Sequence, residues 1–389
     1  MISLTITTLQ WRIKRFIFER KKNQIFDTSS TQKESVALEK FDPRIDALRG
    51  LAFLIVFVCH FSYLNKNLTN AYYFAPYGVV LFFCLTGFLL GRICLREMKT
   101  TGNLQIHMFL LRRLLRIFPL YTLFLLLILI LSLISLHFGN GALVISKGEW
   151  IHLVTSSYNF ISLSGTNASP LPAVTWSLSV EEQIYLIFPF LMYFFGRFKS
   201  ATIMIFLASI MLSTWFVFIA PESNIAIERL TTTFLIPTSV GLFIAQIESQ
   251  LRKMVFAKWH HLIFFLGISS GWLFMILHNK NSVDYLVNVV IVSLSFPLIY
   301  LILLKVRMSF LILGLAKMGR ISYGCYLYHW LFWNILQKSI YLFSPIDGFS
   351  LFGVLAGFVL TLITASISYR FFEKKFLLIR QRFQIVRTI

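Results

Sequence analysis

Charged residues and cysteines are both scarce in this sequence. Only 13% of its 389 residues are charged, whereas 57% are hydrophobic, and the mean hydropathy is +0.74. A soluble domain carries about 25% charged residues, so this composition excludes a soluble globular protein. The four cysteines form no CxxC pair, so we expect no bound metal and no disulfide framework. Residues 1–43 contain no apolar stretch of signal-peptide length, so we expect no cleavable signal peptide.

Acidic residues are outnumbered by basic ones, 16 against 36, and the net charge is +20. Such an excess can indicate a nucleic-acid-binding protein, but the positions of the basic residues indicate membrane topology. With the N-terminus inside, thirty of the 36 lie in segments expected in the cytoplasm and five in external loops, while Arg49 lies within the first apolar run. This bias follows the positive-inside rule. We therefore predict that both termini are cytoplasmic and that nucleic acid is not a partner.

Long apolar runs occur throughout the chain. Those long enough to cross a bilayer lie at about residues 47–64, 76–95, 114–138, 177–195, 201–220, 232–248, 259–277, 284–304, 319–337 and 351–372. The predicted fold class is an all-α integral membrane protein with about ten transmembrane helices. We predict a basic N-terminal extension (1–43), a transmembrane domain (44–376) and a short basic tail (377–389). Gly87 and Gly91 have GxxxG spacing, which favours close helix packing.

The first apolar run contains two ionisable residues, Arg49 and His60, eleven positions apart. Because a helix turns about 100° and rises about 1.5 Å per residue, the two lie on one face to within roughly 20° and about 16 Å apart. Such side chains are costly to place in lipid, so we expect them to face a protein interior or a watery cleft. The alternative is that Arg49 reaches a lipid headgroup and His60 only bonds a neighbouring helix.

Three arginines, Arg112, Arg113 and Arg116, cluster where the third run begins, and Tyr121 follows them. Guanidinium groups offer paired donors to phosphate oxygens, so the cluster suits a phosphate-rich ligand that approaches from the cytoplasm. Position alone favours the alternative, in which these arginines are topology anchors.

Glu181 and Glu182 follow Trp176 and Ser177 at the outer end of the fourth run. A carboxylate that enters lipid needs a partner, and His60 lies at a matching depth on a helix of opposite direction. This match predicts that Glu181 orients the imidazole of His60; the alternative is a structural pairing with backbone or with an arginine. In the ninth run, the composition around His329 favours a helix-packing histidine over a catalytic one.

Six segments, in this order, resemble the acyltransferase-3 family of bacterial membrane acyltransferases over residues 42–376. They read RIDALRG with His60, GVVLFFCLTGFL, RRLLRIFPLY, TWSLSVEEQIYLIFP, ISYGCYLYHW and SYRFFEKKF. Val80 departs from the aspartate that the family often has in the second segment. The resemblance implies transfer of an acyl group, usually acetyl, from cytoplasmic acyl-CoA to a hydroxyl of an envelope glycan. Such glycans include lipopolysaccharide O-antigen and other surface polysaccharides, and the implied location is the bacterial inner membrane.

The same resemblance implies roles for individual residues. The functional Arg and His of the family correspond to Arg49 and His60, and its RRxxR segment corresponds to the three clustered arginines. We predict that His60 is a general base or a transient acyl carrier. The predicted catalytic residues are Arg49, His60 and Glu181. The predicted acetyl-CoA-binding residues are Arg112, Arg113, Arg116 and Tyr121, and the predicted acceptor-binding residues are Trp176, Ser177, Glu182 and His329.

Two other functions fit a polytopic membrane protein with buried ionisable residues. One is a transporter of glycan precursors or acyl donors, and the other is a non-catalytic scaffold for envelope assembly. The arginine cluster, together with the Arg49 and His60 pair, favours the enzyme over both.

Overall fold

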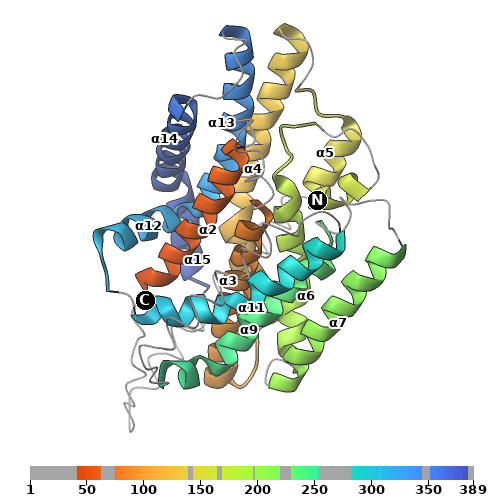
Figure 1. Cartoon of the computed structure of the whole chain (residues 1–389), viewed down its shortest axis with the longest axis vertical. Coiled ribbons are helices and arrows are strands. Elements are labelled where there is room, and N and C mark those ends of the chain that lie inside the picture. The colour runs from red at the N-terminus through yellow and green to blue at the C-terminus, as the bar shows by residue number, and fades with distance from the viewer. Residues whose placement is uncertain are drawn as a thin grey trace, which may run out of the picture. The chain divides into compact units, whose positions relative to one another are not determined.

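The computed structural model describes residues 42–62, 75–138, 143–163, 169–195, 198–219, 229–253, 282–305, 307–343 and 351–383. Within these ranges the chain is helical and has no strand, which confirms the predicted all-α class (Figure 1). The elements are α2 (Pro43–Ser62), α3 (Ala75–Thr101), α4 (Ile106–Phe138), α5 (Lys147–Val154), η2 (Tyr158–Leu163), α6 (Thr175–Phe195), α7 (Lys199–Ile219), α9 (Thr231–Lys253), α11 (Ser282–Lys305), α12 (Phe310–Arg320), α13 (Ser322–Phe343), α14 (Leu351–Ser368), η3 (Tyr369–Glu373) and α15 (Lys374–Gln381).

Seven helices of the described part are long and apolar enough to cross a bilayer. They are α3, α4, α6, α7, α9, α11 and the continuous helix in which the π-helical turn η3 joins α14 to α15. α2 and α13 are helical at the first and ninth predicted runs, and the predicted run at 259–277 lies outside the described residues. The protein is therefore a multi-pass membrane protein, while the number ten and the sides of the termini stay predictions.

Glycines allow the backbones of α3 and α9 to touch. A Cβ built on Gly87 in α3 would lie 2.0 Å from the carbonyl oxygen of Thr238, and one on Gly241 in α9 would lie 2.0 Å from that of Cys84. A Cβ on Gly91 would lie 2.7 Å from the side chain of Leu242. The prediction that Gly87 and Gly91 mediate close helix packing is confirmed. This contact fixes α3, which supplies much of the cavity wall described below.

We expect Gly241→Ala to destabilise the protein, because the added methyl group would meet backbone that cannot rotate away. Overpacking of this kind costs about 1–3 kcal/mol of the free energy of unfolding. The midpoint of thermal unfolding of the purified protein measures the effect. Gly314→Ala is the matched control, since a Cβ there has no heavy atom within 4 Å. Equal midpoints for the two variants would contradict a tight α3–α9 contact.

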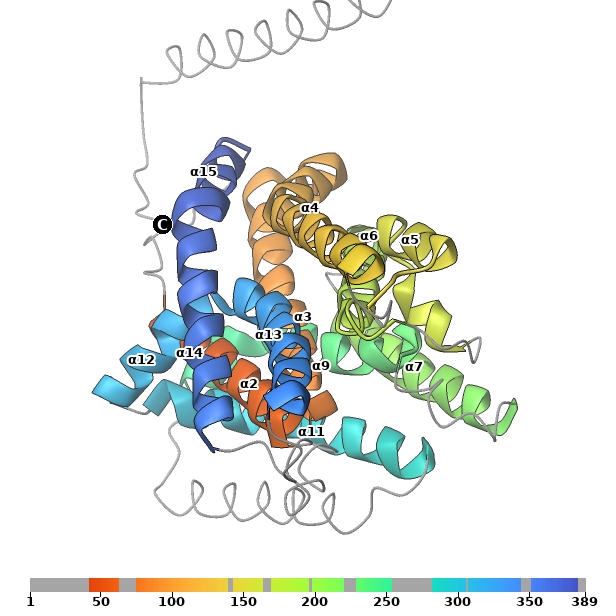
Figure 2. The same ribbon diagram turned by 90° about the horizontal axis from the view of Figure 1, so that it is seen from above.

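The short helix α12 was not predicted, because its eleven residues are too few to cross a bilayer. α12 packs against the N-terminal half of α2, where a Cβ on Gly319 would lie 1.8 Å from the carbonyl oxygen of Asp46. Figure 2 shows α12 beside α2 and α14. α12 thus holds the beginning of α2, the part of that helix that carries Arg49.

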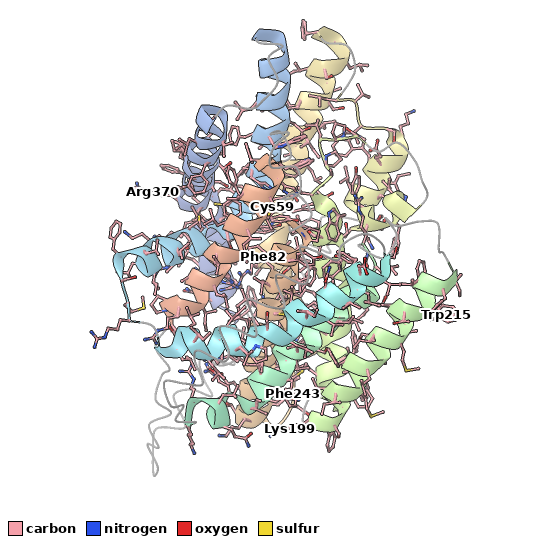
Figure 3. All side chains as sticks on the ribbon, viewed as in Figure 1. Cys59, Phe82, Lys199, Trp215, Phe243 and Arg370 are labelled. Carbon is pink, nitrogen blue, oxygen red and sulfur yellow. The ribbon has the colours of Figure 1, made fainter. Side chains whose placement is uncertain are left out.

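α7 has a large apolar face directed away from the described helices. Met211 is 71% exposed and Trp215 is 62% exposed, and Figure 3 shows Trp215 at the outer side of α7. Exposed apolar side chains along one face of a membrane helix are typical of lipid contact. We therefore place α7 at the lipid-facing periphery, away from the cavity.

Candidate functional site

A cavity of about 800 Å³, including its open mouth, lies between α2, α3, α4, α6 and α13. Apolar residues of α3, among them Phe82 (Figure 3), form much of its wall. Its polar and charged lining residues are Arg49, Thr86, Arg113, Arg116, Ser177, Glu181, Tyr185, Ser322, Tyr323 and Tyr326. The cavity thus brings together five residues of the predicted site: Arg49, Arg113, Arg116, Ser177 and Glu181.

One end of the cavity is basic. The Arg113 guanidinium lies over the rings of Phe109 and Tyr185, at 5.6 and 5.5 Å from their centroids. Arg49 donates to Asp46 at 3.3 Å, and the Arg116 guanidinium has no hydrogen bond or ion pair with the described residues. Three guanidinium groups with so few anionic partners form a site suited to phosphate oxygens.

The other two predicted donor-binding residues do not line this cavity. Nη2 of Arg112 pairs with Glu97 Oε2 at 2.7 Å, and its Nη1 donates to the carbonyl oxygen of Phe383. The hydroxyl of Tyr121 donates to the carbonyl oxygen of Leu153 at 2.9 Å. These hydrogen bonds direct both side chains away from the cavity. They connect α4 to Glu97, Leu153 and Phe383. Of the predicted acetyl-CoA-binding residues, the structure thus places Arg113 and Arg116 on the cavity wall, together with Arg49.

His60 pairs with His329. Nδ1 of His60 lies 3.0 Å from Nε2 of His329, and the two rings stack with their centroids 5.3 Å apart. Trp330 packs edge-on against His60 at 5.0 Å, and the indole N–H of Trp333 donates to the His60 carbonyl oxygen. His329 is fully buried. α13 therefore fixes both the position and the ring orientation of His60.

Glu181 does not contact His60, so the predicted pairing is wrong in this structure. Its carboxylate accepts hydrogen bonds from the hydroxyl groups of Tyr185 and Thr86. The reason is geometric: these donors lie on α6 itself and on α3, while α13 supplies the partner of His60. Glu181 remains a carboxylate in the cavity wall.

Of the predicted acceptor-binding residues, only Ser177 lines the cavity. Its hydroxyl lies 2.7 Å from that of Tyr326. The Trp176 indole packs on Phe234 and beneath the guanidinium of Arg229. Glu182 accepts a hydrogen bond from Ser156, whose positive φ of 53° marks a tight turn in the segment after α5. Trp176 and Glu182 thus contact neighbouring segments and do not line the cavity.

α13 connects the cavity to the histidine pair. The ring of Tyr326, which lines the cavity, lies 5.5 Å from the ring of His329. Tyr323, Tyr326 and His329 follow each other at intervals of three residues, so they share one face of the helix. This spacing was available in the sequence and would have indicated a functional face of α13. The described residues hold no group of histidine, cysteine and carboxylate side chains that suits a metal ion.

The fold and the cavity define a multi-pass helical membrane protein in which a cavity lined by three arginines lies next to a histidine pair, with Tyr326 between the cavity and His329. Residues 42–370 match the family model for the acyltransferase domain, so the chain belongs to the acyltransferase-3 family, as the sequence predicted.

Among curated relatives, the chain is similar to the peptidoglycan O-acetyltransferase OatA of Listeria monocytogenes. The identity is 25% over 362 residues, which cover 86% of this chain and 55% of that protein. It is also similar to the O-acetyltransferase OatA of Staphylococcus aureus (strain NCTC 8325), with 26% identity over 365 residues, 87% of this chain and 58% of the relative. The chain therefore spans slightly more than half the length of these relatives. No solved structure matches.

Proposed function

We propose that this protein is an O-acetyltransferase that moves an acetyl group from cytoplasmic acetyl-CoA to a hydroxyl group of a cell-envelope glycan. The observation that carries the proposal is that the arginine-bearing cavity shares a wall residue, Tyr326, with the surroundings of the histidine pair. Arg49, Arg113 and Arg116 lie in the cavity wall, and Tyr326, in the same wall, contacts one member of the His60–His329 pair.

The donor binds with its phosphates on the three arginines. The uncharged pantetheine arm follows the largely apolar wall formed by α3. The apolar side chains of this wall do not compete with phosphate for the guanidinium groups. Arg49 and His60 are eleven residues apart on α2, which corresponds to about 16 Å along the helix axis. An extended arm of that length delivers the thioester to the histidine pair.

His60 acts as the general base. Its Nδ1 faces Nε2 of His329. In this proposal Nδ1 of His60 carries the proton, and Nε2 of His60 accepts the proton of the acceptor hydroxyl. The hydroxyl oxygen then bonds to the thioester carbon, and the carbon–sulfur bond breaks. The proton on His60 passes to the departing sulfur, which leaves as the free thiol of CoA. His329 is in this scheme a positioning residue, and Glu181 accepts hydrogen bonds within the cavity.

The acceptor is a glycan hydroxyl on the outer side of the bacterial inner membrane. One relative carries peptidoglycan in its name, and lipopolysaccharide O-antigen is the other acceptor that we propose to test. The assay measures release of CoA thiol from acetyl-CoA by the purified protein, with and without each glycan. Release that depends on one glycan supports the function and names the acceptor. Absence of release and of CoA binding by the folded protein would favour a transporter instead.

We expect Arg113→Gln to raise the KM for acetyl-CoA about tenfold, since a charge-assisted hydrogen bond to phosphate is lost. The difference from wild type should shrink as salt is added, because ions screen an attraction at an open mouth. Initial rates at several acetyl-CoA and salt concentrations measure both effects. Lys99→Gln removes one exposed charge elsewhere and is the matched control. An unchanged KM would return Arg113 to a role as topology anchor.

A further inference from the structure

The last described helix, α15, is a neighbour of α4, the helix that carries Arg113 and Arg116 of the cavity wall. It continues α14 through the π-helical turn η3 and packs against α4. The carbonyl oxygen of Phe383, just after α15, accepts a hydrogen bond from Arg112 of α4. α15 (Lys374–Gln381) spans the predicted boundary between the transmembrane domain and the basic tail at residue 377. α15 also lies beyond residue 370, where the match to the family model ends.

α15 carries Arg380, which adds a further positive charge to the arginines of α2 and α4. The positive charges of Arg116, Arg113, Arg49 and Arg112 lie near enough to repel that of Arg380. Its Nε is buried and has no hydrogen-bond partner in the described part of the chain. A buried donor without an acceptor is unfavourable, and so is a cation placed among like charges. The arrangement is therefore incomplete without an anion.

The carboxylates paired with these arginines do not supply that anion. Glu97 is bonded to Arg112, and Asp46 is shared between Arg49 and Arg320. Glu373 interacts electrostatically with Arg116, and its carboxylate accepts a hydrogen bond from Ser368. None of these three carboxylates forms an ion pair with Arg380 in the described part of the chain. A phosphate group has the charge to offset the repulsion and the oxygens to accept from a buried guanidinium N–H.

We propose that Arg380 binds a phosphate group of the acyl donor and so completes the phosphate site from the side of α15. The inference rests on the proposed function, because it takes the ligand to be acetyl-CoA. It assigns donor binding to a segment beyond the family match. The other source of phosphate chemistry at this membrane face is a lipid headgroup, which the experiment separates from CoA.

The test compares wild type with Arg380→Gln in nanodiscs of neutral phosphatidylcholine, using CoA and dephospho-CoA as probes. We expect the Kd for CoA to rise about tenfold in the variant, as for loss of a charged hydrogen bond. Arg382→Gln, an exposed arginine two residues further along, is the matched control and should bind CoA as wild type does. If Arg380 contacts the 3′-phosphate, its substitution will not weaken binding of dephospho-CoA further.

Thermal unfolding provides a readout that a purely structural arginine would not give. Without ligand, Arg380→Gln should unfold at a higher temperature than wild type, because like-charge repulsion is relieved. With CoA, the variant should gain less stability than wild type, since ligand stabilisation follows occupancy. A variant that unfolds earlier without ligand and binds CoA normally would assign Arg380 a packing role and overturn the inference.

The remaining outcomes are also distinct. If wild type binds CoA and Arg380→Gln binds it equally well, this inference fails while the proposed function stands. If wild type does not bind CoA at all, the proposed function fails as well. If the substitution lowers CoA affinity only after phosphatidylglycerol is added to the nanodiscs, Arg380 serves a lipid headgroup, and the inference is overturned.

Discussion

Replacing His60 with alanine is expected to lower acetyl transfer by at least about 100-fold, the lower end of what a general base contributes. Binding of CoA should be retained, because His60 does not line the cavity that holds the arginines. Glycan-dependent thiol release measures the first effect, and the CoA-induced rise in unfolding temperature measures the second. His107→Ala, which changes an exposed histidine at the start of α4, is the matched control.

A folded His60→Ala protein with full activity would refute both the base and the carrier roles. The two roles are separated by incubating wild type with labelled acetyl-CoA in the absence of glycan. Label that stays on wild-type protein and is absent from the variant would indicate an acetylated imidazole, with Nε2 of His60 as the nucleophile. Absence of label, with activity that depends on His60, would support the general base.

Substitution of His329 should have the second-largest effect, and its signature is a lower kcat with little change in the KM for acetyl-CoA. Partners that orient a functional side chain are typically worth about 10- to 100-fold. His329→Ala removes the acceptor that faces Nδ1 of His60 at 3.0 Å, so the imidazole loses its fixed tautomer. His329→Gln retains an acceptor oxygen and should recover part of the rate.

The comparison of these two variants is informative because both remove a fully buried ring from the same position. If His329 only fills space, alanine and glutamine should lower the unfolding temperature without a difference in kcat between them. A kcat that is higher for glutamine than for alanine, at similar stability, supports the positioning role. Equal rates for the two variants would reduce the pair to a packing contact.

Membrane helices could be predicted from the sequence, because each one must be apolar and long enough to cross the lipid. A long apolar run is visible locally, whatever the helix packs against. Helix ends were less accurate: α4 begins at Ile106, eight residues before the predicted run at 114, because hydropathy falls at the arginines while the helix continues. α12 was missed for a similar reason, since its eleven residues are too short for a span.

For the candidate site too, relations within one helix were predictable, whereas contacts between helices were not. Arg49 and His60 lie on one helix, α2, as the apolar run predicted, but only Arg49 lines the cavity. The partner of His60 could not be found this way, because it depends on how α13 and α6 are rotated toward α2. Glu181 and His60 were expected at the same depth in the membrane, which suggested that they pair. The contact with His60 is instead made by His329, 269 residues away in the sequence. Arg112 pairs with Glu97, whereas its neighbour Arg113 lines the cavity. This difference also depends on tertiary packing.

The separation of Arg49 from His60 along α2 has a consequence for membrane voltage. In the proposed scheme the multiply charged nucleotide stays at the arginine end, and only the pantetheine arm reaches the histidines. The acetyl group leaves the sulfur and a hydrogen atom replaces it, so the arm returns with the charge it brought. Moving one elementary charge across a membrane at 100 mV involves about 2.3 kcal/mol, but here no net charge crosses. In the proposed scheme the reaction is therefore electroneutral, and the membrane potential would neither drive nor oppose the modification of a glycan.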